Sequence, residues 1–112
     1  MTKITFLMKD GLFTGFEACG HASFDVSGKD VVCAAISVLT TNTVNALSEI
    51  NHEELSVNTY EGVMTVKMKS NYEKSSQTLF QALELGLIGI SKKYGSKYCK
   101  VDYKEENANV RA

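Results

Sequence analysis

One histidine and one cysteine early in the chain have the side chains and the setting of a nucleophile and its base. His21 stands in the short segment Gly20-His21-Ala22, and Cys33 stands in an apolar run over residues 31–37 that follows Asp30. Asp30 is a good N-cap, so we expect a helix to begin there with Cys33 as its third residue. Unpaired backbone N–H groups and the helix dipole favour a thiolate at that position. A thiolate within reach of a histidine is the basis of nucleophilic cysteine catalysis.

Plainer interpretations of both residues stay open at this stage. A free cysteine in a small apolar run usually packs as part of the core, and a loop histidine is more often a surface residue than a catalyst. The 12 positions between His21 and Cys33 span up to ~40 Å when extended. The spacing therefore permits a contact between the two side chains without requiring it.

Three blocks of sequence carry a resemblance to a known family. The segments Gly20-His21-Ala22, Gly28-x-Asp30 and Val31-Val32-Cys33-Ala34-Ala35-x-Ser37 resemble, in order and spacing, the signature of the ribosomal-processing cysteine proteases of Gram-positive bacteria. The resemblance implies a catalytic dyad in which His21 is the general base and Cys33 the nucleophile. No cofactor is implied.

The same resemblance implies a substrate and a partner. The family removes a short N-terminal extension from a large-subunit ribosomal protein, number twenty-seven in the usual scheme, after aromatic or apolar residues. We expect that role in ribosome maturation here, together with a homodimer. An extended substrate peptide could add along an edge of the sheet and place its side chains in pockets.

Other residues of the motif have possible supporting roles. Asp30 either caps the helix or orients His21, and the cap is the plainer interpretation. Ser37 lies one turn after Cys33 on the same face of the helix. Its hydroxyl could line the site, stabilise an oxyanion or hydrogen-bond a carbonyl of the preceding turn. Backbone N–H groups at the start of the helix are an equally good oxyanion hole. Gly20 and Gly28 bracket a long loop over residues 20–29, which we expect to be a flap with these glycines as hinges.

Composition predicts one small cytoplasmic domain. A net charge of −1 over 112 residues disfavours direct binding to nucleic acid through phosphate neutralisation. The N-terminus lacks the apolar core of a signal peptide, and no uninterrupted apolar run approaches the ~20 residues of a membrane helix. Three cysteines, an odd number, fit a reducing compartment. We therefore expect no membrane segment and no disulfide framework.

Alternation and turn signals predict the elements that must position the dyad. Strands are expected over residues 4–8 and 12–19, joined by an Asp10-Gly11 hairpin turn, with a bulge or close backbone approach at Gly15. A helix from Asp30 to about Glu49 follows. The remaining predicted elements are strands over 55–59, 64–68 and 99–103, and a helix between a Ser70-x-x-Glu73 capping box and Gly95.

The order ββαββαβ predicts an α+β fold in which two amphipathic helices pack on a mostly antiparallel, five-stranded sheet. A single domain would span residues 1–103, with residues 104–112 as a polar tail. Cys19 and Cys99 fall in predicted strands, where core packing is the simpler role, and His52 falls in a polar turn.

Two other functions remain in competition with the protease. Cys19, His21 and Cys33 could serve as zinc ligands of a small metal-binding module, although no Cys-x-x-Cys segment and no evident fourth ligand accompany them. The chain could also be a non-catalytic, ribosome-associated dimerisation domain that retains a vestigial dyad.

Overall fold

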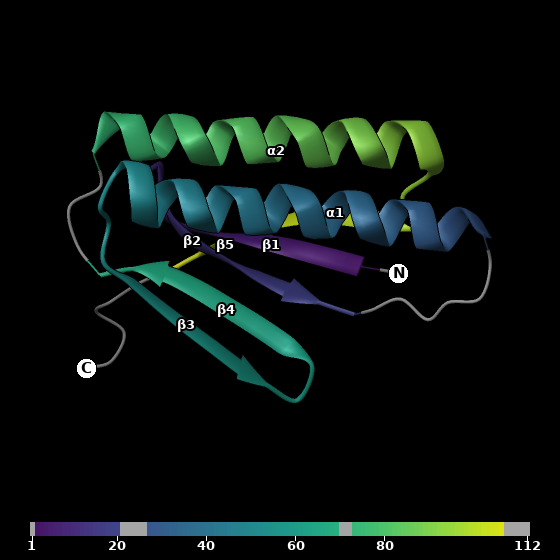
Figure 1. Cartoon of the computed structure of the whole chain (residues 1–112), viewed down its shortest axis with the longest axis horizontal. Coiled ribbons are helices and arrows are strands. Elements are labelled where there is room, and N and C mark those ends of the chain that lie inside the picture. Colours follow the sequence, from purple (N-terminus) through teal and green to yellow (C-terminus); the bar gives the residue numbers. More distant parts are fainter. Residues whose placement is uncertain (1, 21–26, 70–72, 107–112) are drawn as a thin grey trace.

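Two helices lie side by side on one face of a five-stranded sheet (Figure 1). The computed structural model describes residues 2–20, 27–69 and 73–106. The helices are α1 (Ser27–Asn45) and α2 (Lys74–Tyr94). The strands are β1 (Thr2–Lys9), β2 (Leu12–Cys19), β3 (Leu55–Tyr60), β4 (Val63–Met68) and β5 (Cys99–Glu105). The predicted ββαββαβ order and α+β class are confirmed.

The sheet has the order β3-β4-β2-β1-β5, and every neighbouring pair except β1–β5 is antiparallel. Both hairpins turn through two residues of positive φ, Asp10 (53°) with Gly11 (80°) and Glu61 (51°) with Gly62 (80°). Two such residues are the signature of the type I′ turn, whose twist matches that of the strands it joins. The predicted Asp10-Gly11 hairpin turn is therefore confirmed.

The core lies between the helices and the face of the sheet that they cover. Gly86 of α2 lies so close to α1 that a Cβ built on it would be 3.0 Å from Cδ1 of Leu39. The two helices therefore pack tightly along this line. The fully buried large side chains are Phe6, Phe16, Phe80, Ile4, Leu7, Leu47, Leu83, Leu87, Val32 and Val66.

Helix α1 begins four residues earlier than an N-cap at Asp30 predicts. Because its first residue is Ser27, Gly28 lies inside the helix and the prediction that it is a flap hinge is wrong. Asp30 is the fourth helical residue rather than the N-cap, which corrects that prediction too. The helix ends as expected near Glu49, through a π-helical turn over Ala46–Ile50.

The stretch Val31–Ile50 is long and apolar enough to cross a membrane by length and composition, with a mean hydropathy of 1.5. Polar residues such as Ser37, Thr40 and Asn42 interrupt the stretch, so it is not an uninterrupted apolar run; its mean hydropathy is high because it holds many aliphatic residues and a single charged residue, Glu49. In this fold the same stretch packs on α2 and the sheet (Figure 1).

Helix α2 begins at Lys74 with Glu73 as its N-cap, and Glu73 makes no capping hydrogen bond through its side chain. Ser70, the other half of the predicted capping box, lies outside the described residues. Polar side chains hold the first turn instead: the Asn51 amide donates to the hydroxyls of Ser75 (3.1 Å) and Ser76 (3.0 Å). Gly95 ends the helix as predicted, with φ of 108°.

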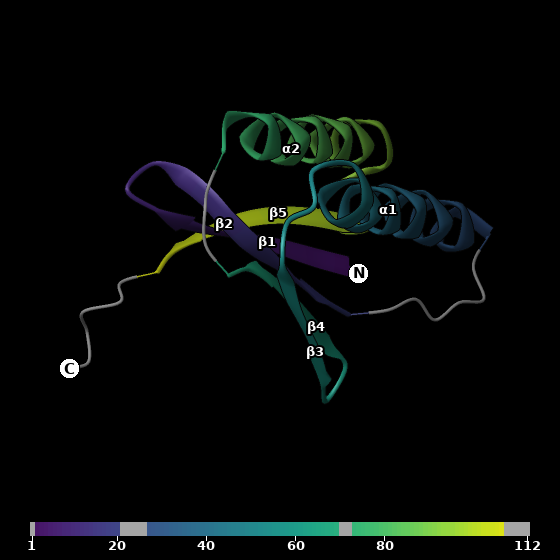
Figure 2. The ribbon, with the colours of Figure 1, turned by 60° about the vertical axis from the view of Figure 1, so that its left-hand side comes forward.

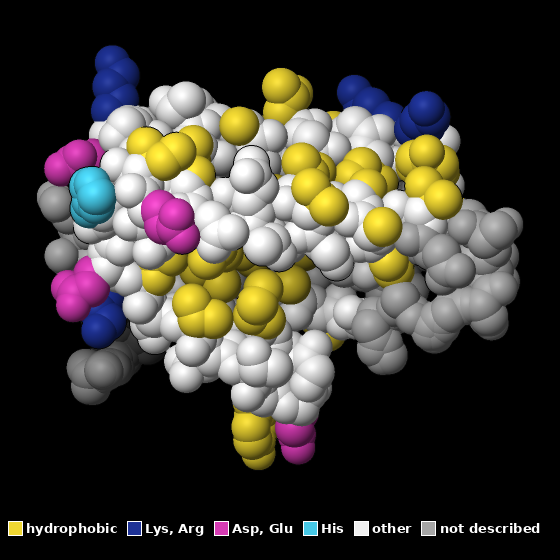
Figure 3. Space-filling view, viewed as in Figure 1, with side chains coloured by type: hydrophobic (Ala, Val, Ile, Leu, Met, Phe, Trp, Pro, Cys, Tyr) yellow, Lys and Arg dark blue, Asp and Glu magenta, His cyan; other side chains and the backbone are white. Residues whose placement is uncertain are grey.

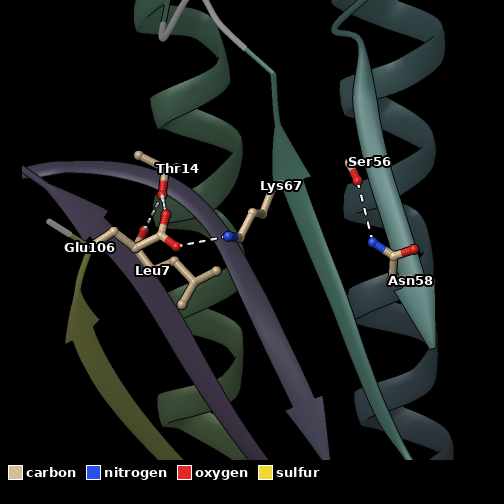
Figure 4. Close-up of polar contacts among 6 residues, drawn as sticks. All are labelled: Leu7, Thr14, Ser56, Asn58, Lys67 and Glu106. Atoms are coloured by element: carbon tan, nitrogen blue, oxygen red, sulfur yellow. Dashed lines mark hydrogen bonds and ion pairs between the residues drawn. The ribbon is translucent and has the colours of Figure 1, made fainter. Parts of the chain in front are cut away.

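The fold extends past the predicted boundary at residue 103. Strand β5 continues to Glu105, and the next residue, Glu106, accepts a hydrogen bond from the Thr14 hydroxyl (3.1 Å) and pairs with Lys67 (2.9 Å) (Figure 4). Thr14 is the extra residue of a β-bulge, since Leu7 pairs with Gly15 and Met8 pairs with Phe13. Residues 104–106 thus belong to the domain, and the predicted tail starts too early.

The predicted close approach at Gly15 is confirmed and has a measurable consequence. A Cβ at this position would lie 2.1 Å from the Val66 carbonyl oxygen, and neither backbone can move without breaking the β2–β4 ladder. We expect Gly15→Ala to lower the free energy of unfolding in urea by about 2–4 kcal/mol. Gly89→Ala is the matched control, because a Cβ there meets nothing within 4 Å and should stabilise α2 by about 0.5–1 kcal/mol. Equal effects of the two substitutions would contradict the packing.

Candidate active site

Cys33 opens into a small cavity between α1 and the sheet. The cavity holds about 200 Å³ and is walled by Thr2, Ala18, Gly20, Cys33, Ile36, Ser37, Thr40 and Met64. These residues come from one flank of α1, from β1, from the end of β2 and from the start of β4. None of the described residues that line the cavity carries a charge. The half-buried thiol of Cys33 therefore faces a neutral space large enough for a few substrate atoms.

The strands supply walls that local sequence patterns do not identify. Ala18 and Met64 are register partners on neighbouring strands, so both point toward the helices at the same level of the sheet. Thr2 is held nearby because its N–H donates to the Tyr98 carbonyl (3.0 Å). Alternation along each strand indicates which face these residues occupy, but only the tertiary fold brings them to Cys33.

The early start of α1 changes the surroundings of Cys33. Cys33 is the seventh helical residue rather than the third, so its N–H lies beyond the four free N–H groups of the helix start. The helix-dipole effect fades within the first turn. The N–H groups around Cys33 are thus committed to the helix, and the helix start is a less direct source of an oxyanion hole than predicted.

Ser37 lines the same cavity one turn after Cys33. Among the described residues none hydrogen-bonds its hydroxyl, whereas the neighbouring Thr40 hydroxyl donates to the carbonyls of Ile36 (2.9 Å) and Ser37 (3.2 Å). Among the described lining residues, the hydroxyls of Ser37 and Thr2 are therefore side-chain donors available to the cavity, and Ser37 is the one on the same helix as the thiol, whereas the Thr40 hydroxyl is already used by the helix.

His21 and the side chain of Asp30 lie outside the described part of the chain. The contact of His21 with Cys33 and the role of Asp30 accordingly stay predictions. Gly20, which precedes His21, lies at the wall of the cavity with φ of 91°, a conformation that glycine adopts freely.

The sequence of the chain matches a known protein family. The model of the family described as Cysteine protease Prp matches residues 1–100. The chain belongs to the Prp family of cysteine proteases. Membership makes it a hydrolase that uses a thiol nucleophile, as the pattern around Cys33 predicts.

Solved structures share the Prp fold over nearly the whole chain. SMU.848 from Streptococcus mutans is 27% identical, with a TM-score of 0.79 over 95% of this chain and 96% of its own. The ribosomal processing protease Prp from S. aureus, with a covalently linked product peptide, is 24% identical, with a TM-score of 0.81 over 93% of this chain and 100% of its own. The same protease with a substrate peptide is 21% identical, with a TM-score of 0.77 over 95% and 100%. No curated protein matches the chain.

The other two cysteines of this Prp-family chain have different surroundings. Cys99 is buried as predicted, its Sγ lies 3.7 Å from the Leu87 carbonyl oxygen, and burial raises the pKa of its thiol. Cys19 is exposed, so the prediction that it packs in the core is wrong. It follows Ala18 in β2 and therefore points to the opposite face of the sheet from the cavity.

The arrangement does not favour the zinc module. Cys19 and Cys33 lie on opposite sides of the sheet, whereas a zinc site needs its ligands within about 2.3 Å of one ion. Among the residues that the structure describes, no group of three or more His, Cys, Asp and Glu side chains could hold a metal.

Thiol alkylation should follow these surroundings. We expect iodoacetamide to modify Cys33 and Cys19 in the wild type and to spare Cys99, because burial keeps its thiol neutral and inaccessible. In a Cys19→Ser background, intact mass should show one modified thiol, assigned to Cys33 by peptide mapping. A Cys33 rate well above that of Cys19 favours a catalytic thiol over a vestigial one. Modification of Cys99 at a rate similar to Cys33 would contradict the assignment.

Proposed function

We propose that this protease removes the N-terminal extension of large-subunit ribosomal protein twenty-seven in the cytoplasm and so supports ribosome maturation. The family match, the His21–Cys33 motif and the structural likeness to a protease named for ribosomal processing all support this substrate. The observation that carries the proposal is the position of Cys33 at a neutral cavity, while Cys19 is on the far face and Cys99 is in the core.

Cys33 acts as nucleophile and His21 as the base. The imidazole takes the thiol proton, and the thiolate forms a bond to the scissile carbonyl carbon while the carbonyl π electrons move to oxygen. When this intermediate collapses, the C–N bond breaks and the imidazolium gives its proton to the leaving amine. Water, deprotonated by His21, then attacks the thioester and releases a carboxylic acid and the free thiol.

The position of Cys33 in the second turn of α1 increases the need for His21. A helix terminus stabilises a thiolate chiefly in the first turn, so a neighbouring base is the stronger source of ionisation here. Gly20 lies at the cavity wall and is one peptide bond from His21, which supports the dyad.

Ser37 is our proposed donor to the developing oxyanion. Its hydroxyl lines the cavity beside Cys33, and one such donor typically contributes about 10²–10³-fold to a rate. Asp30 stays a proposal as a residue that orients His21.

Cys33→Ala should abolish cleavage of a peptide that spans the cut, with a loss of at least about 10³-fold in kcat, because no other group supplies the nucleophile. Alanine favours the helix, so circular dichroism should be unchanged. Cys33→Ser is the matched control for size and should also fail, since a hydroxyl ionises far less than a thiol. Undiminished cleavage by either folded variant would show that Cys33 is not the nucleophile, whereas no cleavage by the wild type would favour the non-catalytic domain.

His21→Ala should lower kcat by about 10²–10⁴-fold and shift the remaining activity to more alkaline pH, because the thiol must then ionise without its base. His52→Ala is the control, since the second histidine lies in a turn after α1. A pH–rate profile of His21→Ala with the shape of the wild type would show that His21 is not the base.

We infer that the chain forms a homodimer through the outer side of α1. Residues 31–48 carry no charge. Val38 (66% exposed) lines a shallow groove of α1 together with Ser37, Thr41, Asn42 and Asn45, and Val31 (54% exposed) lies two turns before it on the same helix. A second copy would present the same uncharged helix, so that neither surface would bury an unpaired charge.

Val38→Lys should convert a dimer to a monomer in size-exclusion chromatography with light scattering, because two lysines would meet at the paired helices. Leu85→Lys is the matched control, an equally exposed apolar residue (74%) on α2, and should leave the mass unchanged. A monomeric wild type, or a dimer that persists in Val38→Lys, would rule out this interface.

A further inference from the structure

A cationic surface lies where α2 ends and β5 begins. Residues 85–101 hold four lysines and no acidic residue. Two of the lysines are in the last turn of α2, one is in the turn that follows and one is in β5, and all four are exposed. Figure 3 shows Lys and Arg side chains gathered over the end of α2, whereas the Asp and Glu side chains visible in the same view lie toward the opposite end and on the β3–β4 hairpin. We call this set the lysine surface: Lys92, Lys93, Lys97 and Lys100.

The lysine surface has no carboxylate partners in the described part of the chain. The two ion pairs among the described residues, Lys3–Asp102 and Lys67–Glu106, use other lysines. The net charge of −1 over the whole chain disfavours a polyanion on the protein surface as a whole, but positive and negative charges are separated in the fold. The lysine surface is therefore a local excess of positive charge.

Lys100 has a like charge beside it in the sheet. It is the register partner of Lys3 on β1, and both point away from the helices because their neighbours Ile4 and Cys99 are fully buried. Like charges on neighbouring strands repel each other. Asp102 lies 3.6 Å from Lys3 and offsets one of the two charges, so an anion from another molecule would offset the other.

Two ordinary roles account for only part of the lysine surface. Lysines in the last turn of a helix complement its dipole, which explains Lys92 and Lys93. A lysine on an edge strand hinders pairing with another sheet, which explains Lys100 on β5. Lys97 lies in the connecting turn and has neither role. Together the four lysines extend from the helix layer around the edge strand to the open face of the sheet, a path that a flexible anionic chain can follow.

Two tyrosines alternate with the lysines and indicate which polyanion fits. Tyr94 is 37% exposed and Tyr98 is half-buried. The Lys93 Nζ lies 5.7 Å from the centre of the Tyr94 ring, and the Lys97 Nζ lies 5.5 Å from the centre of the Tyr98 ring. Single-stranded nucleic acid is bound by cationic side chains that contact phosphates and by aromatic rings on which bases stack. An acidic peptide uses the lysines alone, so the tyrosines favour a nucleic acid.

The lysine surface adjoins the catalytic cavity. The Tyr98 carbonyl accepts a hydrogen bond from the Thr2 N–H (3.0 Å), and Thr2 is a wall of the cavity that holds Cys33. The connection from α2 to β5 lies at the end of the sheet where β1 begins (Figure 2). A nucleic acid strand held by the lysines therefore lies beside the cavity without entering it.

We propose that the lysine surface binds single-stranded RNA through its phosphates, with Tyr94 stacking on a base, and that it holds the protease next to RNA-bound substrates. The proposal rests on the ribosomal protein substrate proposed above, since ribosomal RNA is the polyanion that such a protein binds. Binding of this kind weakens with salt: neutralisation of three or four phosphates gives a slope of log K against log salt concentration of about −2 to −3.

The test compares two double charge reversals that change the net charge equally. Lys93→Glu/Lys97→Glu alters the lysine surface, whereas Lys69→Glu/Lys74→Glu alters two exposed lysines near the start of α2, about 30 Å away along this 21-residue helix. The probe is a fluorescent oligouridine of about 12 nucleotides, titrated by anisotropy at about 50 and 200 mM salt. We expect the first variant to raise Kd at least about tenfold and the second to leave it within about twofold. Tyr94→Ala should raise Kd about fivefold or more.

RNA binding and peptide cleavage are measured separately. Both double variants should cleave a short peptide spanning the cut like the wild type, because none of the four altered lysines lines the cavity. A wild type that binds RNA in this way but cleaves no such peptide supports the lysine surface and counts against the proposed substrate alone.

The proposal has two ways to fail. No RNA binding by the wild type at about 50 mM salt, or equal Kd values for the two double variants with circular dichroism unchanged, would overturn the lysine surface as a binding site. Polyglutamate that competes with the RNA equally well, together with an unchanged Kd for Tyr94→Ala, would overturn RNA as the partner and identify an acidic protein instead.

Discussion

The tight packing of α1 against α2 is the contact on which the site depends. Gly86 has no side chain, and a Cβ built on it would lie 3.0 Å from Cδ1 of Leu39. One flank of α1 therefore packs against α2 and the sheet. Residues on that flank, such as Val32, fill the core. The adjacent flank, with Cys33 and Ser37, is left beside β2 and β4, where the strands do not fill the space and a cavity remains. Close packing on one side of the helix thus creates the opening on the other.

The sequence predicts best those features that single residues fix locally. Asp10 with Gly11 and Glu61 with Gly62 form tight turns because their backbones adopt positive φ. Gly15 was expected at a close approach, and the Val66 carbonyl lies where its side chain would be. Element order and fold class follow from such local signals combined with alternation.

Features that depend on distant contacts could not be predicted in this way. An N-cap stabilises a helix by about 1 kcal/mol. A few additional helical residues can stabilise it by as much, so Asp30 alone does not determine where α1 begins. Glu106 belongs to the domain because Thr14 and Lys67 bind it, and nothing in the tail's own composition indicates those partners. The cavity likewise joins Thr2, Cys33 and Met64 from three elements, so residue types alone identify Cys33 but not its surroundings.

The parallel pairing of β1 with β5 joins the first strand of the fold to the last. Thr2, a wall of the cavity, is held by the carbonyl of Tyr98, at the entrance to β5. On the ribosome β1 emerges first and has no such neighbour until nearly the whole described chain has been synthesised. The cavity wall can therefore close only after synthesis of the strand that completes the sheet. The active site of such a protease therefore forms only when its synthesis is nearly complete, and not on a shorter nascent chain.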